Sequence, residues 1–394
     1  MPGMKCPRFS KLEVLKSVNR DNLLDLLRSG GGEAYFAGRK CPLPDDGVAL
    51  DYEVIRDVLM DPDTDTPAEL AGSLYHIDDM STDDAMQAIL DRCAEEGIDL
   101  EEGDDPSPGD VAVRLWLVNA DLLYELHAEQ TVLKKRSFDY FAGQSGNNGP
   151  VAFTKPAKAT VLAMEADLDA EFLKRKKGAK NAKIHVYVDG ADTWFLVRRG
   201  DPVQRTGTVE KGVSSTVVLR PEVYDIVIYN RDLDELAVNA KAPKDKELYC
   251  QKFGLHLFGG LDYFPVADKY TLEPLRGGPD CLDVDDVSGV EAVTLREVVY
   301  VFGGGKNAET EIHKAQDLFA AIAQRKGKIP DHARLASASF EVTFTAARKY
   351  SRIVKVRPKN TLQCKHGDEA IVVDRWLRAR EFIKPKADDG DEDA

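Results

Sequence analysis

The spacing of apolar residues changes once along the 394-residue chain, at Asn147-Asn148-Gly149-Pro150. Before this point, apolar residues recur at helical intervals, as at Leu12, Leu15 and Val18, and glycine or proline ends the runs. After it come short strand-like runs, separated by turn pairs such as Asp189-Gly190. The sequence therefore predicts an all-α region over residues 1–145, followed by mixed α/β structure.

A second break, rich in Gly, Pro and Asp, covers residues 277–288. The length suggests two or three domains of about 100–200 residues each. We expect an α+β multidomain protein with four segments: an acidic helical domain at 1–145, a central mixed α/β domain at 151–276, a basic α+β domain at 289–383 and a disordered acidic tail at 384–394. Within the basic domain, the pattern predicts a helix at 308–326, strands at 339–344 and 351–356, and a helix at 368–380.

Charge is divided unevenly along the chain, whose net charge is −15. Residues 1–110 hold 10 basic and 26 acidic side chains, whereas residues 285–387 hold 19 basic and 13 acidic ones. The total argues against a protein that coats nucleic acid or an anionic membrane with its whole surface. The C-terminal domain is nevertheless basic enough to attract an acidic partner.

The cysteines and the apolar runs predict a reduced, cytoplasmic protein that does not enter a membrane. The six cysteines stand singly, with no C-x-x-C pair, so neither a zinc site nor a disulfide framework is indicated. The N-terminus lacks the apolar stretch of a signal peptide. No cofactor is indicated by a motif, and we expect no metal site from the cysteines and histidines.

Residues 162–258 predict a helix, a strand hairpin, two further strands and a helix. Asp225 opens one of these strands, and the next strand begins at Glu235 and carries Asn239 and Lys241. This order, with the spacing from Asp225 to Lys241, resembles the core of the PD-(D/E)xK nuclease superfamily. The resemblance implies a restriction-endonuclease-like fold for the central domain.

The same resemblance implies chemistry at Asp225 and Lys241. Two carboxylates would hold Mg²⁺, which prefers oxygen ligands, and the lysine would orient the attacking water. The second carboxylate of the family falls on Asn239, a neutral and weaker ligand, although Asp234 or Glu235 stands nearby. The implied centre is therefore degenerate, and the alternative is an ordinary α/β domain with surface Asp and Lys residues.

Two basic clusters predict contacts with nucleic acid, because clustered cations supply most non-specific affinity for phosphates. The first comprises Lys174, Arg175, Lys176 and Lys177. The second includes Arg348, Lys349, Arg352, Lys355, Arg357, Lys359, Arg375 and Arg378. A second interpretation is that these faces pair with the acidic N-terminal domain of the same chain or of another chain.

Two functional hypotheses follow. The first is a binding or scaffold protein within a larger assembly, with a protein partner and a basic region that contacts nucleic acid or an acidic partner. The alternative is a Mg-dependent nuclease, or an inactive relative, with its centre at Asp225, Asn239, Lys241 and Glu235. A setting in bacterial genome maintenance or antiphage defence would suit either hypothesis.

Overall fold

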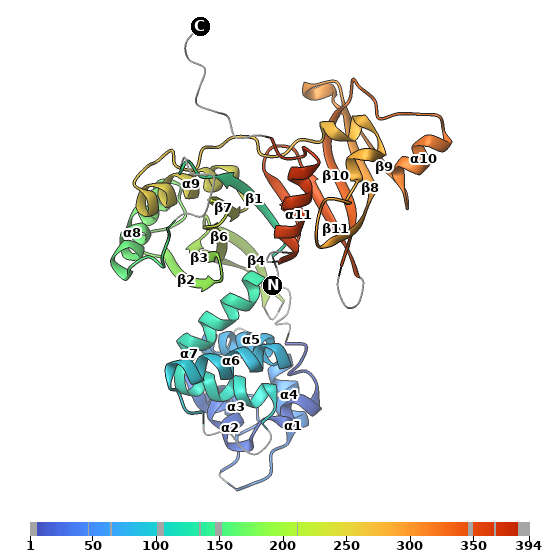
Figure 1. The fold of residues 1–394 in the computed structure, drawn as a ribbon. Helices are drawn as coiled ribbons and strands as arrows, with labels where there is room; N and C mark the ends of the chain where they lie inside the picture. Colours follow the sequence, from blue (N-terminus) through green and yellow to red (C-terminus); the bar gives the residue numbers. More distant parts are fainter. Residues whose placement is uncertain are drawn as a thin grey trace. The chain divides into compact units, whose positions relative to one another are not determined.

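The computed structural model describes residues 6–45, 47–63, 65–100, 106–133, 135–145, 152–210, 212–345, 350–365 and 368–384. The chain divides into two compact units, residues 1–134 and 135–394 (Figure 1). The linker predicted at 147–150 and the acidic tail beyond Lys384 lie outside the described residues. Among the described helices, none combines the length and the apolar composition needed to cross a bilayer.

Unit 1 is helical. Its elements are α1 (Leu12–Ser17), α2 (Arg20–Arg28), the short 3₁₀ turn η1 (Ser29–Gly31), α3 (Gly32–Gly38), α4 (Tyr52–Met60), α5 (Ala68–Met80), α6 (Asp83–Glu96) and α7 (Pro108–Leu133). The helical pattern of the sequence is confirmed here. The side chain of Thr82 caps α6 by accepting from the Ala85 amide at 3.2 Å, and Gly97 ends that helix at a φ of 68°.

Unit 2 combines helices with strands. In chain order it contains β1 (Ser137–Ala142), α8 (Lys158–Lys174), β2 (Lys183–Asp189), β3 (Asp192–Gly200), β4 (Gln204–Glu210), β5 (Val213–Leu219), β6 (Glu222–Asn230), β7 (Glu235–Asn239), α9 (Pro243–Phe258), η2 (Glu273–Gly277), η3 (Pro279–Leu282), β8 (Val290–Phe302), η4 (Gly305–Asn307), β9 (Glu309–Lys314), α10 (Leu318–Gln324), β10 (Arg334–Phe344), β11 (Tyr350–Arg357), β12 (Thr361–Gln363) and α11 (Asp368–Ala379).

Ten of these strands form one sheet, in the order β2-β3-β6-β7-β1-β12-β11-β10-β8-β9. Neighbouring strands are antiparallel throughout. The central and C-terminal segments of the chain therefore contribute to the same sheet, and β1 joins them by pairing with both β7 and β12. Strands β4 and β5 form a separate two-stranded sheet.

Helices cover both faces of this sheet. On one face, α8 and α9 pack over β3, β6 and β7, where Phe172, Phe195 and Phe253 belong to one buried cluster. On the opposite face of the C-terminal strands lies α11, whose Trp376 contacts the ring of Phe340 at a centroid distance of 5.2 Å. The helices predicted at the two ends of residues 162–258 and at 368–380 are confirmed.

Two segments differ from the sequence-based prediction. Residues 137–142, expected within the all-α region, form β1, because they complete the backbone hydrogen bonds of β7 and β12. The helix predicted at 308–326 is wrong in its first half. Residues 309–314 form β9, whose β-branched Thr310 and Ile312 suit an edge strand paired with β8, and helix begins at Leu318. In both cases pairing with a distant strand decides the local structure.

Candidate functional site

Asp225, the first carboxylate of the nuclease-like pattern, lies in β6 and is 2% exposed. Its Oδ2 accepts hydrogen bonds from Arg199 Nε at 2.6 Å and from the Tyr249 hydroxyl at 2.7 Å. Burial alone would lower the pKa of Arg199, but its hydrogen bond and charge interaction with Asp225 outweigh burial and raise that pKa. Asp225 is therefore held by two donors inside a closed network of polar side chains.

A second carboxylate extends this network at the start of α9. Asp245 is 2% exposed and accepts from Lys177 Nζ at 2.5 Å. Arg175 reaches it at 3.1 Å and Arg199 at 3.5 Å. Asp201 contacts Arg199 at 3.1 Å. We call Asp225, Arg199, Asp245, Lys177 and Asp201 the buried ion network, in which cations and carboxylates pair with one another.

The strand register places Asp225 and Asn239 on opposite faces of the sheet. Ile226 is paired with Asn239, so these two side chains share a face, and Asp225 points to the other one. The Asn239 Nδ2 donates to the carbonyl of Ser137 on β1 at 2.6 Å. Lys241 follows β7 and is exposed. The structure therefore does not bring Asp225, Asn239 and Lys241 together.

Glu235 belongs to a different cluster, on the face of β7 that it shares with Asn239. Lys269 Nζ lies 2.7 Å from Glu235 and 2.9 Å from Asp374 on α11, and Arg378 binds Asp374 at 2.7 Å. Burial raises the pKa of Glu235 above its usual value, against the opposing effect of Lys269. Burial would also raise that of Asp374, but Lys269 and Arg378 lower it. These contacts hold α11 against the sheet.

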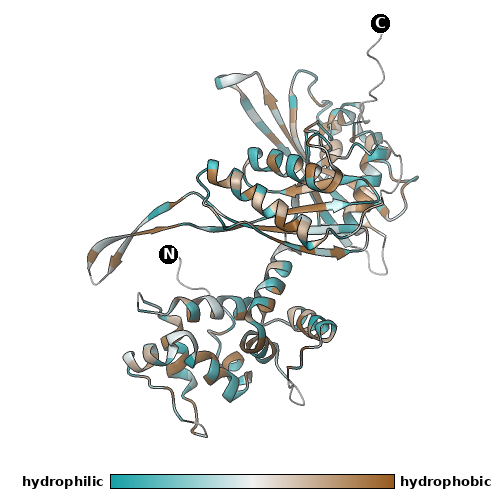
Figure 2. Cartoon of the chain, turned by 90° about the vertical axis from the view of Figure 1, so that its left-hand side faces the viewer, coloured by the Kyte–Doolittle hydropathy of each residue, from teal (hydrophilic) through white to brown (hydrophobic). Residues whose placement is uncertain are grey.

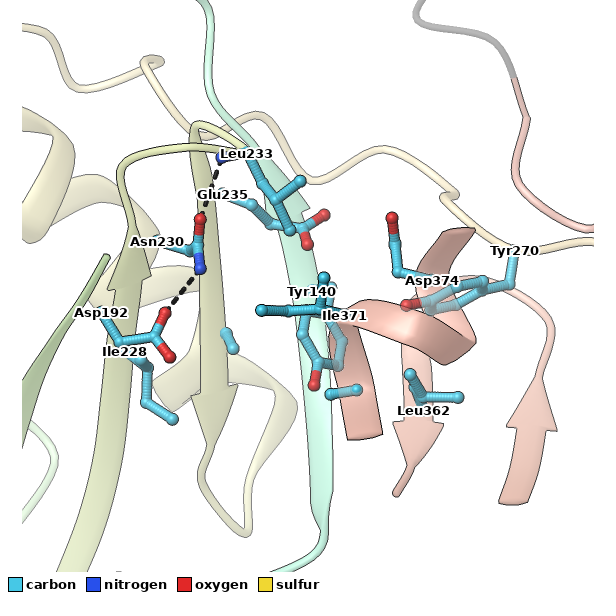
Figure 3. Close-up of a pocket in the computed structure, with 12 residues that line it drawn as sticks. Tyr140, Asp192, Ile228, Asn230, Leu233, Glu235, Tyr270, Leu362, Ile371 and Asp374 are labelled. Carbon is cyan, nitrogen blue, oxygen red and sulfur yellow. Dashed lines mark hydrogen bonds between the residues drawn. The ribbon is translucent and has the colours of Figure 1, made fainter. Parts of the chain in front are cut away.

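A small cavity lies beside this cluster (Figure 3). Figure 3 shows Tyr140, Glu235, Asp374 and Ile371 around it, with Asn230 hydrogen-bonded to Asp192 at its far side at 2.6 Å. Its volume of about 30 Å³ is that of one water molecule. This space is a packing gap next to a structural ion cluster and is too small for a substrate.

The first basic cluster of the sequence is largely committed to carboxylates. Lys174 binds Glu171 at 2.7 Å, while Arg175 and Lys177 bind Asp245 in the buried ion network. Lys176 is exposed. Four consecutive cations in the sequence therefore do not form a common basic surface.

A groove of about 710 Å³ on the C-terminal half of the sheet gathers basic residues from several strands. We call it the basic groove. Its lining contains seven cations and two carboxylates: Arg136, Arg296, Lys314, Arg352, Lys355, Arg357 and Lys365, with Glu297 and Glu369; the other lining residues are Ser339, Ser351, Ile353, Gln363 and Cys364. Cationic side chains outnumber anionic ones, in contrast to the buried ion network.

The register of the strands explains why these residues meet. Lys314, Glu297, Ser339, Lys355, Gln363 and Ser137 form one row across β9, β8, β10, β11, β12 and β1. Side chains alternate along each strand, so Val354 and Val356 point to the opposite face, where they are buried. The basic groove is thus the polar face of strands whose other face builds the core.

The cations of the basic groove differ in what holds them. Glu297 binds Lys355 at 2.9 Å and Lys314 at 3.7 Å, and the hydrogen bond from Lys355, against the effect of burial, lowers the pKa of Glu297. Arg352 lies 3.8 Å from Glu369. No described residue forms an ion pair with Arg136, Arg357 or Lys365, and all three are exposed. These three cations are available to an anion from solution.

Three of the predicted nucleic-acid contacts, Arg352, Lys355 and Arg357, line the basic groove. Others do not: Lys359 is exposed and its backbone is bridged to Tyr270, Arg375 donates to Ser288, and Arg378 binds Asp374. Arg348 and Lys349 lie outside the described residues. The predicted contacts did not include Arg136, Arg296 and Lys314, because each lies far in the chain from the two basic clusters. Arg136 ends a separate short run, Lys134-Lys135-Arg136.

Comparison with known proteins adds no relative. No protein-family model matches the chain, and the search of curated proteins returned no match.

Proposed function

We propose that the protein binds nucleic acid by holding its phosphate backbone in the basic groove, as the binding component of a larger assembly. The observation that carries this proposal is the set of seven cations that line one groove, three of them without an ion-pair partner among the described residues. Such a face attracts a polyanion and releases its counterions on binding. The acidity of the rest of the chain would limit this attraction to the groove.

The side chains of the groove suit phosphate oxygens. The guanidinium groups of Arg136 and Arg357 can each donate two parallel hydrogen bonds to one phosphate. Ser351 adds an exposed hydroxyl on the same surface, whereas Ser339 is buried and hydrogen-bonds to Glu297. None of the described lining residues is aromatic, so bases have no ring on which to stack. We therefore expect recognition of the backbone, with little dependence on base sequence.

The test is a salt-titrated binding assay with the full chain and a fluorescent DNA or RNA duplex, with and without Mg²⁺. We expect Arg136→Ala, Arg357→Ala and Lys365→Ala together to weaken binding on the order of 10- to 100-fold. The magnitude of the salt slope should fall by up to about 0.9 for each phosphate that the variant no longer neutralises. The matched control is Lys241→Ala, which removes an exposed lysine that does not line the groove.

Three outcomes would contradict the proposal. One is an absence of binding at moderate salt, and another is equal weakening by the triple variant and the control. The third is preferential capture of an acidic peptide over either nucleic acid, which would assign the groove to a protein partner. Mg²⁺-dependent cleavage that is lost in Asp225→Ala would instead favour the nuclease alternative.

A further inference from the structure

A two-stranded ribbon, residues 204–219, projects from the rest of unit 2 (Figure 2). We call this ribbon, formed by β4 and β5, the arm. It belongs to a sheet of its own, and every residue from Val213 to Val218 is exposed. Val209, Val213 and Val218 are 73%, 67% and 65% exposed. An isolated two-stranded ribbon is marginally stable in water, so this exposed apolar surface calls for a partner.

The outer edge of β5 is the open side of the arm. Residues 213–219 read Val-Ser-Ser-Thr-Val-Val-Leu and contain no charge, glycine or proline. Charged side chains and proline are among the features that normally protect an edge strand from pairing. By contrast, β4 carries Arg205, Gly207 and Glu210. Of the two edges of the arm, that of β5 is therefore the one prepared to accept another strand.

We propose that β5 pairs with β5 of a second copy of this chain, antiparallel and centred on Thr216. In this register Val213 faces Leu219 of the partner, and Ser215 faces Val217. The seven residues carry no charge, so identical strands meet without opposing like charges. The pairing joins two arms into a four-stranded sheet and satisfies the outer backbone groups of both β5 strands.

Charge favours a second copy at this strand and disfavours it at the edges of the ten-stranded sheet. The edge strand β9 carries Glu309, Glu311 and Lys314, and β2 at the other edge carries Lys183 and Asp189. Two chains of net charge −15 repel each other over most of their surfaces. Because β5 is uncharged and lies on a projecting ribbon, two copies can meet there while their acidic surfaces stay apart.

The pairing of two arms does not depend on the proposed function. A dimer would, however, strengthen the binding of nucleic acid. Each dimer would carry two basic grooves, so a long nucleic acid that reached both would gain avidity without any new contact. Failure of nucleic-acid binding would leave the dimer unaffected, and failure of the dimer would leave single-groove binding intact.

The first test measures the mass of the full chain by sedimentation over micromolar concentrations. We expect a dimer that Thr216→Lys weakens at least about tenfold, because it places two ammonium groups at the symmetry axis. The matched control, Val209→Lys, adds the same charge to β4 and should leave the dimer intact. A mass of one chain, 43.6 kDa, at every concentration would overturn the proposal, and so would a dimer insensitive to Thr216→Lys.

The second test fixes the register by oxidative cross-linking. Thr216→Cys should form a disulfide between copies, since directly opposed residues have Cβ atoms roughly 5 Å apart. Ser214→Cys alone should not, because its two copies lie four positions apart, or about 13 Å. The double variant Ser214→Cys, Val218→Cys should cross-link again. Equal cross-linking by all three, or by none, would overturn the register.

Discussion

The buried ion network and the basic groove use the same residue types for opposite purposes. In the network, Arg199 and Lys177 are 2% and 8% exposed and meet Asp225 and Asp245. In the basic groove, cations outnumber carboxylates and remain in contact with solvent. The difference teaches that a basic side chain is available to a ligand when no carboxylate of the same chain pairs with it.

The position of a basic residue in the sequence does not show whether it pairs with a carboxylate or lines the basic groove. Lys174 to Lys177 are contiguous, yet three of the four are bound to acidic residues. Lys314 is isolated in the chain and Arg136 ends a short run, Lys134-Lys135-Arg136, far from the two basic clusters, yet both line the groove. If the buried ion network is structural and the basic groove binds a ligand, variants of the first should lose stability and variants of the second should lose affinity.

The largest effect is expected from Asp225→Asn. This change removes the carboxylate nearest to the buried Arg199, while Asp201 and Asp245 remain. Breaking a buried ion pair costs up to about 3–5 kcal/mol when the remaining charge is uncompensated, so this figure is the upper bound here. Urea denaturation should show that loss in the free energy of unfolding. The control, Asp201→Asn, alters a more exposed carboxylate at the rim of the network and should cost clearly less. Equal stability of the two variants would mean that Asp225 is not an anchor of the fold.

The triple change of Arg136, Arg357 and Lys365 to Ala should leave the free energy of unfolding within about 0.5 kcal/mol, because these side chains are exposed. The same variant should lose most of its affinity for nucleic acid. A large loss of stability would show that these three cations support the fold, as the buried ion network does, and would contradict the distinction between the two regions.

Glu297→Gln should tighten nucleic-acid binding by a factor of about five, or roughly 1 kcal/mol. It removes a negative charge from the groove and releases Lys355 and Lys314 for phosphate. A fluorescence titration at low salt measures the gain, which should shrink as salt is added. Weaker binding by this variant would show that Glu297 positions Lys355 for the ligand.

The smallest effect concerns the pH dependence of stability. Because Lys355 lowers the pKa of Glu297 below the usual value of about 4.3, the ion pair stabilises the fold above that usual value. Its contribution is lost as the pH falls through the lowered pKa. The difference in melting temperature between the natural protein and Glu297→Gln should therefore be present at neutral pH and vanish in strong acid. A difference that persists there would not arise from the charge of Glu297.

Much of the local structure could be predicted, because helical spacing and caps such as Thr82 and Gly97 act within a few residues. The order of the ten strands could not, since β1 and β9 owe their conformation to strands far away in the chain. The sequence also does not predict which side chains of β6 and β7 share a face. A shift of one residue in their register would reverse which side chains accompany Asp225, and the sequence does not specify that register.

The candidate site was predictable to the same extent. Lys355 and Arg357 alternate with the buried Val354 and Val356, a local pattern that identifies a half-exposed strand. Arg136 and Lys314 join them through pairings between strands that are distant in the chain. The restriction-endonuclease-like arrangement of the central segment stays a prediction.

The position of β1 also has a consequence for how the chain is made. Thr361 donates to Asp139 and Asn360 to the carbonyl of Tyr140, across more than 200 intervening residues. A ribosome must therefore synthesise the chain through residue 361 before the middle of the sheet can close. Unit 1 has no such requirement and can collapse while synthesis continues. Unit 2 pairs strands that are distant in the chain, and such pairings slow folding, so a chaperone would protect this unit most while its sheet is incomplete.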